Sequence, residues 1–444
     1  MKRYSETLDS QAKMRIDAKP KNATTVIKSK VLIPGRGDPI RDGTVVFEKA
    51  TIAWVGDSWN LPKEYCSILP INVEVLMPGL WDCHVHFLGV DMDKTNMEDS
   101  MQTYLPGFST RAGILAADDL KATLSAGYTS IRELGGFGAD IWPAVQAGHI
   151  KGPNIYAAVA LLSITGGHGD DQNAPVSTVR EHMRSGAPVA VCDGIDGCVK
   201  AVRDVVRRGA RVVKVASSGG VLSPNDDPED QQFSDEELRA IVGEATRSRR
   251  AVAAHAIGKS GIMAALNAGV TTIEHGTFLD DEAADLMVAR GAILVPTRHV
   301  DRVIEDNYID KLPAPSRRKF LDLLPESIRS YKLALDKGVK IAMGTDIMSS
   351  GRSSKLSHGT NGHELEYAVE MGMSPLAAIE AATANGPETL GRMAPLSGQL
   401  REGYDADVIA VASNPLDDIS VLADPLKITH VWKAGEIVKC PLGD

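Results

Sequence analysis

Residues 80–87 of the chain read LWDCHVHF, an apolar run of the length typical of a buried β-strand. Side chains two residues apart on a strand project to the same side, so His84 and His86 share one face while Cys83 and Val85 take the other. Two imidazoles at such positions can chelate one cation. Inward histidines also serve as hydrogen-bonded core residues, so the pair indicates a metal site only if other strand ends carry similar side chains.

The rest of the middle of the chain alternates β-rich runs with helix-like segments. Many of the helix-like segments end in Ala-Gly or Arg-Gly just before the next run, which is a typical helix stop. Eight strands, each followed by a helix, predict an α/β protein with a (β/α)₈ TIM barrel, and long connections follow the third, fourth, seventh and eighth strands, where such a barrel carries its active site. The eight runs are residues 80–87, 129–134, 154–164, 211–217, 251–256, 271–275, 292–297 and 340–346.

The two ends of the chain have a different texture from the middle. Val and Ile alternate with polar residues between Gly-Asp turns, which is typical of half-buried antiparallel strands. Neither end is long enough to fold well alone. We therefore predict that residues 1–76 and 398–444 pair into one small β-sandwich domain, which brackets a barrel at residues 77–397.

Charge and cysteine usage exclude several classes of partner. The net charge of −10, with both signs interspersed, argues against nucleic acid and anionic membranes. The five cysteines are scattered without a disulfide or CxxC pattern, which favours a reducing compartment. The first 22 residues lack the apolar stretch of a signal peptide, so we expect a cytoplasmic protein.

Three further strand ends carry residues that bind metals. His255 closes the fifth strand, His275 the sixth and Asp346 the eighth. A polar residue at one barrel mouth is unremarkable by itself, but four strand ends with imidazole or carboxylate indicate a metal centre. These ligand types suit Zn²⁺ best, with Mn²⁺, Co²⁺ or Fe²⁺ as alternatives.

Lys214 lies in the middle of the apolar fourth strand, residues 211–217. An unpaired ammonium is costly to bury, and burial near cations lowers the pKa of a lysine. A neutral amine can add CO₂ to form a carbamate whose oxygens bridge two metal ions. The alternative is a lysine paired with a buried carboxylate. We predict N6-carboxylysine at Lys214 and two divalent ions.

This arrangement also predicts a reaction. The charge of two dications exceeds that of a carbamate, Asp346 and a hydroxide, so positive charge remains to polarise a substrate carbonyl. Water bound between the ions has its pKa lowered towards about 7 and becomes a nucleophile. Asp346 is placed to take its proton and to deliver it to a leaving nitrogen.

The chain resembles the binuclear amidohydrolase superfamily along nearly its whole length, and MPGLWDCHVH is similar to that superfamily's first-strand signature. The resemblance implies that His84, His86 and Asp346 bind one metal, that His255 and His275 bind the other, and that Lys214 bridges them. Phe87 stands where dihydroorotase-like members have Arg, and Gly258 where guanine-deaminase-like members have Glu. Both of those branches are therefore disfavoured.

Three stretches resemble the Xaa-Pro dipeptidase branch, which includes enzymes that hydrolyse ochratoxin-type N-acyl amino acids: residues 163–170, 213–238 and 358–383. The resemblance implies a substrate amide whose amine half carries a free carboxylate, and a homo-oligomer. It also implies that His168 approaches the scissile carbonyl oxygen; a backbone-bonded loop histidine is the alternative.

Other residues near the strand ends are candidates for substrate contacts. Val221 and Leu222, after a Gly-rich turn, can line an apolar pocket. Arg298, with His299 and Arg302 beside it, can meet a substrate carboxylate. The acidic residues 226–230 (DDPED) are expected to form a solvated loop or a lid.

Three classes of function follow from these residues. The first is an amide hydrolase acting on Xaa-Pro, other dipeptides or N-acyl amino acids such as ochratoxin A. The second is a hydrolase of cyclic amides, lactones or organophosphates on the same metal centre, because one fold supports several chemistries. The third, a non-catalytic assembly module, leaves Lys214 and four strand-end histidines without a reason. A positively charged side chain that lies opposite the metals and binds the substrate carboxylate would favour the first class.

Overall fold

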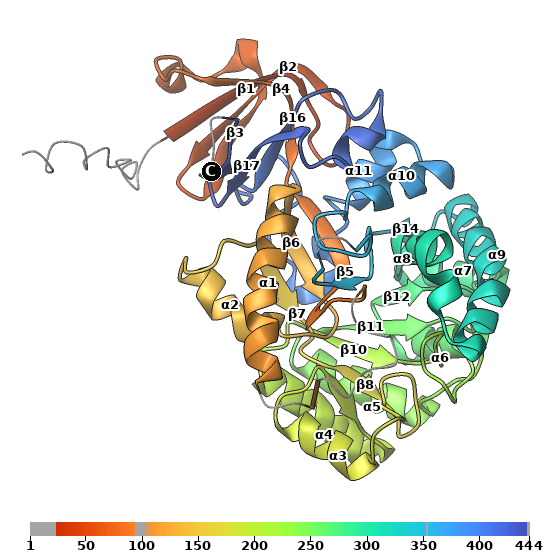
Figure 1. Cartoon of the computed structure of the whole chain (residues 1–444). Helices are drawn as coiled ribbons and strands as arrows, with labels where there is room; N and C mark the ends of the chain where they lie inside the picture. Colours follow the sequence, from red (N-terminus) through yellow and green to blue (C-terminus); the bar gives the residue numbers. More distant parts are fainter. Residues whose placement is uncertain (1–23, 94–102, 105–106, 352–353, 442–444) are drawn as a thin grey trace, which may run out of the picture.

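A computed structural model describes residues 24–93, 103–104, 107–351 and 354–441 of the chain (Figure 1). The prediction about the first 22 residues therefore lies outside the described residues. Within these ranges, no helix has both the length and the apolar character needed to cross a bilayer.

The middle of the chain forms the predicted barrel. Its strands pair in parallel with their neighbours, in one run from the first to the third strand and in a second run from the third to the eighth. Two short strands that were not predicted, β9 (Val189–Val191) and β15 (Ile347–Ser349), extend these runs. The barrel strands are β5 (Leu80–Val90), β6 (Tyr128–Glu133), β7 (Asn154–Ala157), β8 (Leu161–Ser163), β10 (Val212–Ala216), β11 (Ala251–Ala256), β12 (Thr272–His275), β13 (Ile293–Val295) and β14 (Lys340–Ile341).

Backbone hydrogen bonds close this sheet into a ring. The amide of Cys83 donates to the carbonyl of Met343 (2.8 Å), and the amide of Asp346 donates to the carbonyl of His84 (2.7 Å), so the eighth strand joins the first. The third predicted strand, residues 154–164, is interrupted at Val159, whose φ of +75° is rare for a β-branched residue. It is therefore divided into β7, which pairs with β6, and β8, which pairs with β10. The (β/α)₈ prediction is confirmed.

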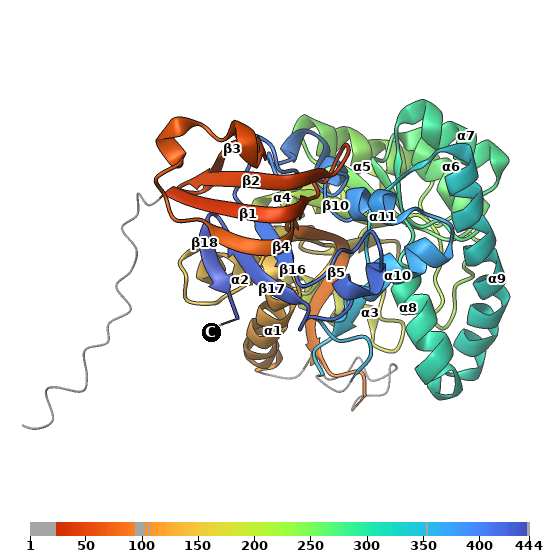
Figure 2. The same cartoon turned by 90° about the horizontal axis from the view of Figure 1, so that it is seen from above.

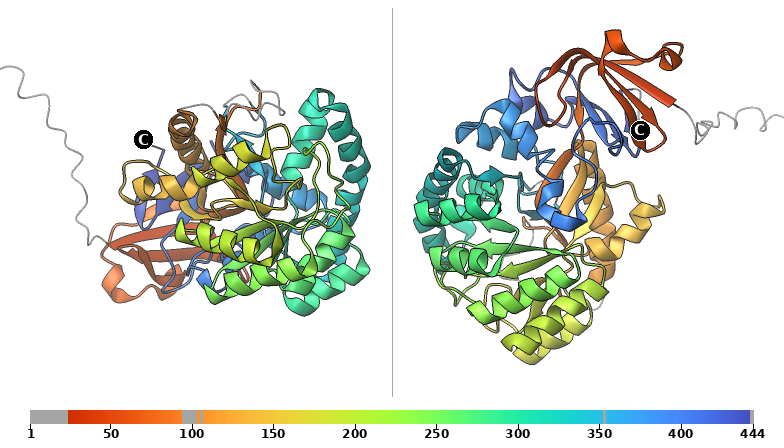
Figure 3. Two further views of the ribbon diagram at one scale, coloured as in Figure 1. Left: turned by 90° about the horizontal axis from the view of Figure 1, so that it is seen from below. Right: turned by 180° about the vertical axis from the view of Figure 1, so that it is seen from behind.

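Helices surround the barrel on its outer side (Figure 3). The expected glycine stops are present, because α6, α7 and α9 end at Gly269, Gly291 and Gly338 in the left-handed conformation. The helices are α1 (Phe108–Ser125), α2 (Gly138–Gln146), α3 (Val176–Arg184), α4 (Gly194–Arg207), α5 (Asp235–Arg247), α6 (Lys259–Ala268), α7 (Asp281–Arg290), α8 (Arg298–Val303), α9 (Ala314–Lys337), α10 (His363–Glu370) and α11 (Pro375–Ala381). Shorter turns are η1 (Ser58–Asn60), η2 (Lys63–Tyr65), η4 (Ile304–Tyr308), η5 (Ile309–Lys311), η6 (Pro387–Met393) and η7 (Ile419–Leu422).

Both ends of the chain build one sheet at the side of the barrel (Figure 2). In it, β1 and β4 pair in parallel, and the other neighbouring pairs are antiparallel. The sheet curls until Ile52 in β3 exchanges backbone hydrogen bonds with Gly403 and Tyr404 (2.9 and 2.8 Å), and this encloses a core that includes Phe47 and Trp432. The predicted β-sandwich is confirmed. The strands follow the order β18 (Glu436–Lys439), β17 (Ile428–Lys433), β16 (Val408–Val411), β4 (Ile71–Pro78), β1 (Thr24–Leu32), β2 (Ile40–Glu48) and β3 (Thr51–Asp57).

A charged pair lies inside the barrel beneath the strand ends. The guanidinium of Arg132 in β6 donates from Nη2 to both carboxylate oxygens of Glu274 in β12 (2.8 and 2.9 Å), and from Nε to the carbonyl of Cys83 (2.6 Å). Both side chains are fully buried. Because neither charge reaches water, each depends on the other.

Replacing Arg132 by Met should therefore destabilise the fold, because Glu274 is left as an unpaired buried charge. A loss of about 3–5 kcal/mol in the free energy of unfolding is expected, visible as a lower midpoint in thermal or urea unfolding. The matched control is Arg203→Met, since the ion pair of Arg203 with Glu244 is at the surface and contributes little. Equal unfolding midpoints for the two variants would show that the buried pair has no such role.

Candidate metal centre

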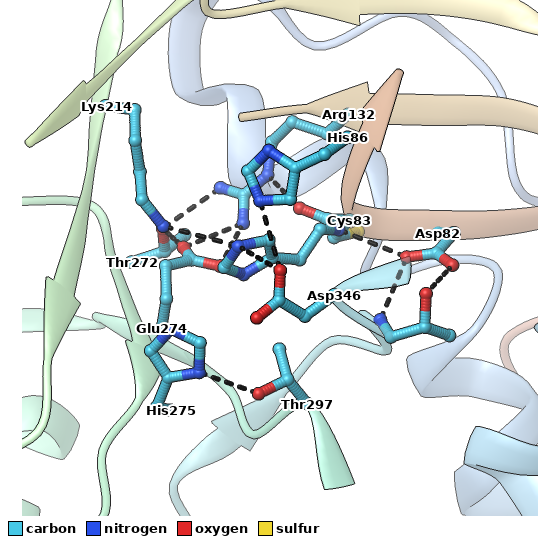
Figure 4. Close-up of polar contacts among 12 residues, drawn as sticks. Asp82, Cys83, His86, Arg132, Lys214, Thr272, Glu274, His275, Thr297 and Asp346 are labelled. Carbon is cyan, nitrogen blue, oxygen red and sulfur yellow. Dashed lines mark hydrogen bonds and ion pairs between the residues drawn. The ribbon is translucent and has the colours of Figure 1, made fainter. Parts of the chain in front are cut away.

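Three of the predicted ligands, His84, His86 and Asp346, converge at the end of the barrel strands. Figure 4 shows two of them, His86 and Asp346, pointing toward one another. The Oδ1 atom of Asp346 lies 3.0 Å from Nε2 of His86 and 3.5 Å from Nε2 of His84. One ligand atom from each of these residues lies within 4.8 Å of the others, a spacing that allows a single cation to be held among them. The alternation of β5 turns both histidines inward, and the closure of the barrel brings Asp346 to them.

The other three predicted ligands extend this cluster across the barrel. The Nζ atom of Lys214 lies 3.5 Å from Nε2 of His84. The ring of His275 lies 5.2 Å from that of His84 and 4.7 Å from that of His255, measured between centroids. All six residues line one cavity, so the structure brings the whole predicted set together.

Hydrogen bonds to backbone carbonyls fix which ring nitrogen two of the histidines, His86 and His255, offer. Nδ1 of His86 lies 2.7 Å from the carbonyl of Gly135 and must donate to it, so Nε2 offers a lone pair to the cavity. Nε2 of His255 lies 3.0 Å from the carbonyl of Gly219, so in that ring Nδ1 is the available nitrogen. Nδ1 of His275 contacts Oγ1 of Thr297 (2.7 Å), and Nδ1 of His84 lies 3.0 Å from Oε2 of Glu274, without hydrogen-bond alignment. Such outer partners orient metal ligands.

The backbone is strained where two of the ligands leave their strands. His275 and Asp346 have φ angles of +69° and +58°, and Thr297, which contacts His275, has +52°. Non-glycine residues adopt this left-handed region at a cost of order 1–3 kcal/mol each. Three of the eight described non-glycine residues with positive φ thus lie at the metal centre, and two of them, His275 and Asp346, line the cavity.

Asp82 ties the first strand to the eighth below the ligands. Its Oδ1 accepts from the amides of His84 and Thr345 (both 3.1 Å), and its Oδ2 accepts from Oγ1 of Thr345 (2.6 Å) and Nδ2 of Asn361 (2.7 Å). Burial raises the pKa of Asp82 to about 6, even though these donors oppose the shift. Asp82 therefore holds the strand of His84 and His86 against the residue that precedes Asp346.

The protonation preferences of the cluster suit a divalent cation. Burial lowers the pKa of His275 to about 4 and the pKa values of His84 and His255 well below their usual range. Burial also lowers the pKa of Lys214 to about 8. Burial alone would raise the pKa of Asp346, but the His84 and His86 rings hold it well below its usual range. In His86 the effect of burial is outweighed by Asp346, which raises the pKa of that ring. Neutral nitrogens beside a carboxylate are the form in which these side chains bind metal, and the lowered pKa values of the other three histidines favour that form.

The cavity of about 290 Å³ above these ligands is mostly apolar. His168, Val221 and Leu222 line it, as predicted. Arg298 is not among the described residues that line it: its side chain is buried, and Nη1 lies 3.4 Å from Oδ2 of Asp301. The structure thus brings nine of the ten predicted site residues to the cavity and turns Arg298 towards a carboxylate on its own helix.

One wall of the cavity was not predicted. It consists of residues from α8, η4 and α9, and four of them, Val300, Ile304, Phe320 and Leu324, pack in one apolar cluster. The sequence of α9 has the pattern of an ordinary amphipathic surface helix, so nothing in it marks a cavity wall. The wall residues are Val300, Asp301, Ile304, Phe320, Leu323, Leu324 and Ser327.

Comparison with known proteins agrees with this architecture. The amidohydrolase family model matches residues 75–438. The chain is 42% identical over 432 residues to ochratoxinase from Aspergillus niger, covering 94% of this chain and 87% of that protein. The crystal structure of A. niger ochratoxinase superposes with a TM-score of 0.87, covering 95% of this chain and 96% of the other.

A second solved structure, a Xaa-Pro dipeptidase with bound methionine in its active site, is 32% identical and superposes with a TM-score of 0.81, covering 94% of this chain and all (100%) of that one. The predicted resemblance is therefore confirmed. The chain belongs to the amidohydrolase family and is a metal-dependent hydrolytic enzyme of the ochratoxinase-like branch.

Proposed function

We propose that this enzyme is a binuclear zinc-dependent amidohydrolase that cleaves the amide bond to a C-terminal amino acid. Its substrates would be N-acyl amino acids with bulky apolar groups, including ochratoxin A, and dipeptides such as Xaa-Pro. The observation that carries the proposal is the convergence of six metal-ligand side chains on a cavity with an apolar opposite wall. The identity to ochratoxinase supports the same substrate class.

The chain's own residues would hold two ions. His84, His86 and Asp346 would hold one, His255 and His275 the other, and Lys214 would join them as N6-carboxylysine. The lowered pKa of Lys214, about 8, supports this, because the neutral amine is the form that reacts with CO₂. When bound, the ions supply an activated water and polarise the amide carbonyl.

Asp346 has the position of a proton carrier. Its Oδ1 faces His84 and His86, which leaves Oδ2 as the atom that takes a proton. An amide nitrogen must be protonated before it departs, and Asp346 would deliver that proton. The strained backbone at Asp346 holds the carboxylate at this point.

The apolar wall would bind the bulky part of the substrate and exclude water from the reaction. Phe320, Leu323 and Leu324 from α9 supply much of this surface. No arginine is among the described residues that line the cavity. With Lys214 carboxylated and the histidines neutral, positive charge there would come from the ions, so the substrate carboxylate would lie towards the metal side. Arg298 was the predicted partner of a substrate carboxylate, and it does not line the cavity. The distinction between amino-acid amides and cyclic amides therefore rests on measured activity towards both kinds of substrate. A cytoplasmic location and a homo-oligomeric state remain predictions from the sequence.

Zinc-loaded enzyme should cleave ochratoxin A and N-acyl-L-phenylalanines with higher kcat/KM than a cyclic amide, a lactone or an organophosphate. Phe320→Ala should selectively weaken the aromatic substrates, by about 10–200-fold, the range for lost apolar contact in a pocket. Leu321→Ala, an exposed neighbour on the same helix, is the control. A preference for the cyclic amide or lactone would contradict the proposal.

Lys214→Ala should leave the fold intact and remove most activity, since the bridge between the ions is lost. We expect kcat/KM to fall by at least the roughly 10–100-fold that outer-shell partners of metals contribute. Short carboxylic acids in the buffer should restore part of it, whereas they should not affect Lys200→Ala on the exposed face of α4. Full activity without added acid would show that Lys214 is structural.

A further inference from the structure

A chain of hydrogen bonds stands behind His168. Nδ1 of His168 lies 3.1 Å from Oγ of Ser223, and Oγ of Ser223 lies 2.5 Å from Oδ1 of Asp226. Nζ of Lys319, on α9, lies 3.3 Å from the same Oδ1 and also donates to the carbonyls of Gly220 (3.1 Å) and Ser223 (2.8 Å). The chain therefore runs from the cavity to the helix that forms the apolar wall.

The side chain of Asp226 is buried, unlike the solvated residue expected for this acidic stretch. It is 6% exposed, and that of Lys319 is 11% exposed. Its Oδ2 accepts from the amide of Gly220 (3.1 Å) and from Nε2 of Gln232 (3.0 Å), while Oε1 of Gln232 accepts from the amide of His168 (3.0 Å). The loop after β10 thus holds His168 in place through hydrogen bonds to its ring and to its backbone amide.

The support requires close contact between the loop backbone and the ring. A Cβ atom on Gly220 would lie 2.0 Å from Nδ1 of His168, so only glycine fits at this position. The ring of His168 also stacks on His255, with centroids 4.2 Å apart and planes at 18°. These contacts leave the ring little freedom to turn.

The hydrogen-bond directions fix the proton on this ring. The carboxylate of Asp226 accepts from its other partners. Oγ of Ser223 lies 2.5 Å from Oδ1 of Asp226 but 3.4 Å from the carbonyl of Gly220, so its single hydroxyl proton points to the nearer acceptor, Oδ1. Oγ of Ser223 must then accept from Nδ1–H of His168. Nδ1 is therefore engaged by Ser223, and Nε2 is the ring nitrogen left free for a group in the cavity.

We infer that Ser223 and Asp226 are positioning residues that hold His168 with its Nδ1–H directed at Ser223, so that Nε2 is the ring atom presented to a substrate group beside the scissile bond. This inference rests on the proposed amide hydrolysis for its substrate half.

The experiment combines a tautomer measurement with kinetics on the full-length, zinc-loaded enzyme. ¹⁵N chemical shifts of labelled histidine, with the His168 signals assigned by their loss in His168→Gln, should show a protonated Nδ1. In Asp226→Asn the amide can donate to Ser223 and reverse the chain, so the proton should move towards Nε2. Asp230→Asn, an exposed residue of the same loop, is the control and should change neither signal.

Ser223→Ala should lower kcat for N-acetyl-L-phenylalanine about 10²-fold, the order expected for a misplaced group at a reaction centre, with KM changed far less. Ser223→Thr keeps the hydroxyl and should keep most of the activity. A wild-type ring without a proton on Nδ1, or Ser223→Ala with wild-type kcat, would overturn the inference. If no amide is hydrolysed at all, the proposed function fails, and the ¹⁵N shifts still decide the tautomer.

Discussion

Closure of the barrel between its first and eighth strands is the constraint on which the metal centre depends. His84 and His86 lie on β5, whereas Asp346 follows β14 more than 250 residues later in the chain. Two backbone bonds, Cys83 to Met343 and Asp346 to His84, bring them together, and the buried carboxylate of Asp82 adds bonds to both sides of the joint. A shift of one residue at this joint would turn the ligands outward, because side chains alternate along a strand. The ligands therefore take their positions only when the barrel closes in this register.

The sequence allowed the metal ligands to be predicted because each one follows a local rule. Alternation on a strand places His84 and His86 on one face, and a lysine in an apolar strand is unusual enough to notice. Asp82 obeys the same alternation, being two residues before His84, and was open to prediction on that ground. The Arg132–Glu274 ion pair could not be predicted in this way. Alternation shows that both side chains point inward, but it does not show that these two strands place their charges against each other.

Two residues lie in other positions than the sequence predicted, and in both cases the position depends on the geometry of a loop or a helix. Arg298 was expected to face a substrate at a strand end, but α8 begins at this residue, so it pairs with Asp301 three positions along the helix. Asp226 was expected to be solvated with its acidic neighbours, yet the loop folds it onto Ser223 and Lys319. In both cases the partner lies on an element whose placement only the folded barrel determines.

Metal ligands come from the strands, while the substrate wall comes from the α8–α9 segment and the loop after β10. Lys319 connects these two sources, because it binds the loop that supports His168 and belongs to the helix that carries Phe320. The strands thus supply chemistry shared across the family, and the connections supply selectivity, as is usual for barrel enzymes. This division explains why the fold and the metal centre were predicted more completely than the substrate pocket.

The central claim is that two ions act together in this cavity, and titration of metal-free enzyme with Zn²⁺ tests it most directly. Bound zinc and hydrolysis of an N-acyl-L-phenylalanine are followed in the same samples, with bicarbonate present for Lys214. The account predicts that activity rises until about two ions are bound per chain, as for a two-metal hydrolytic site. Full activity with one ion bound, unchanged by the second, would contradict it.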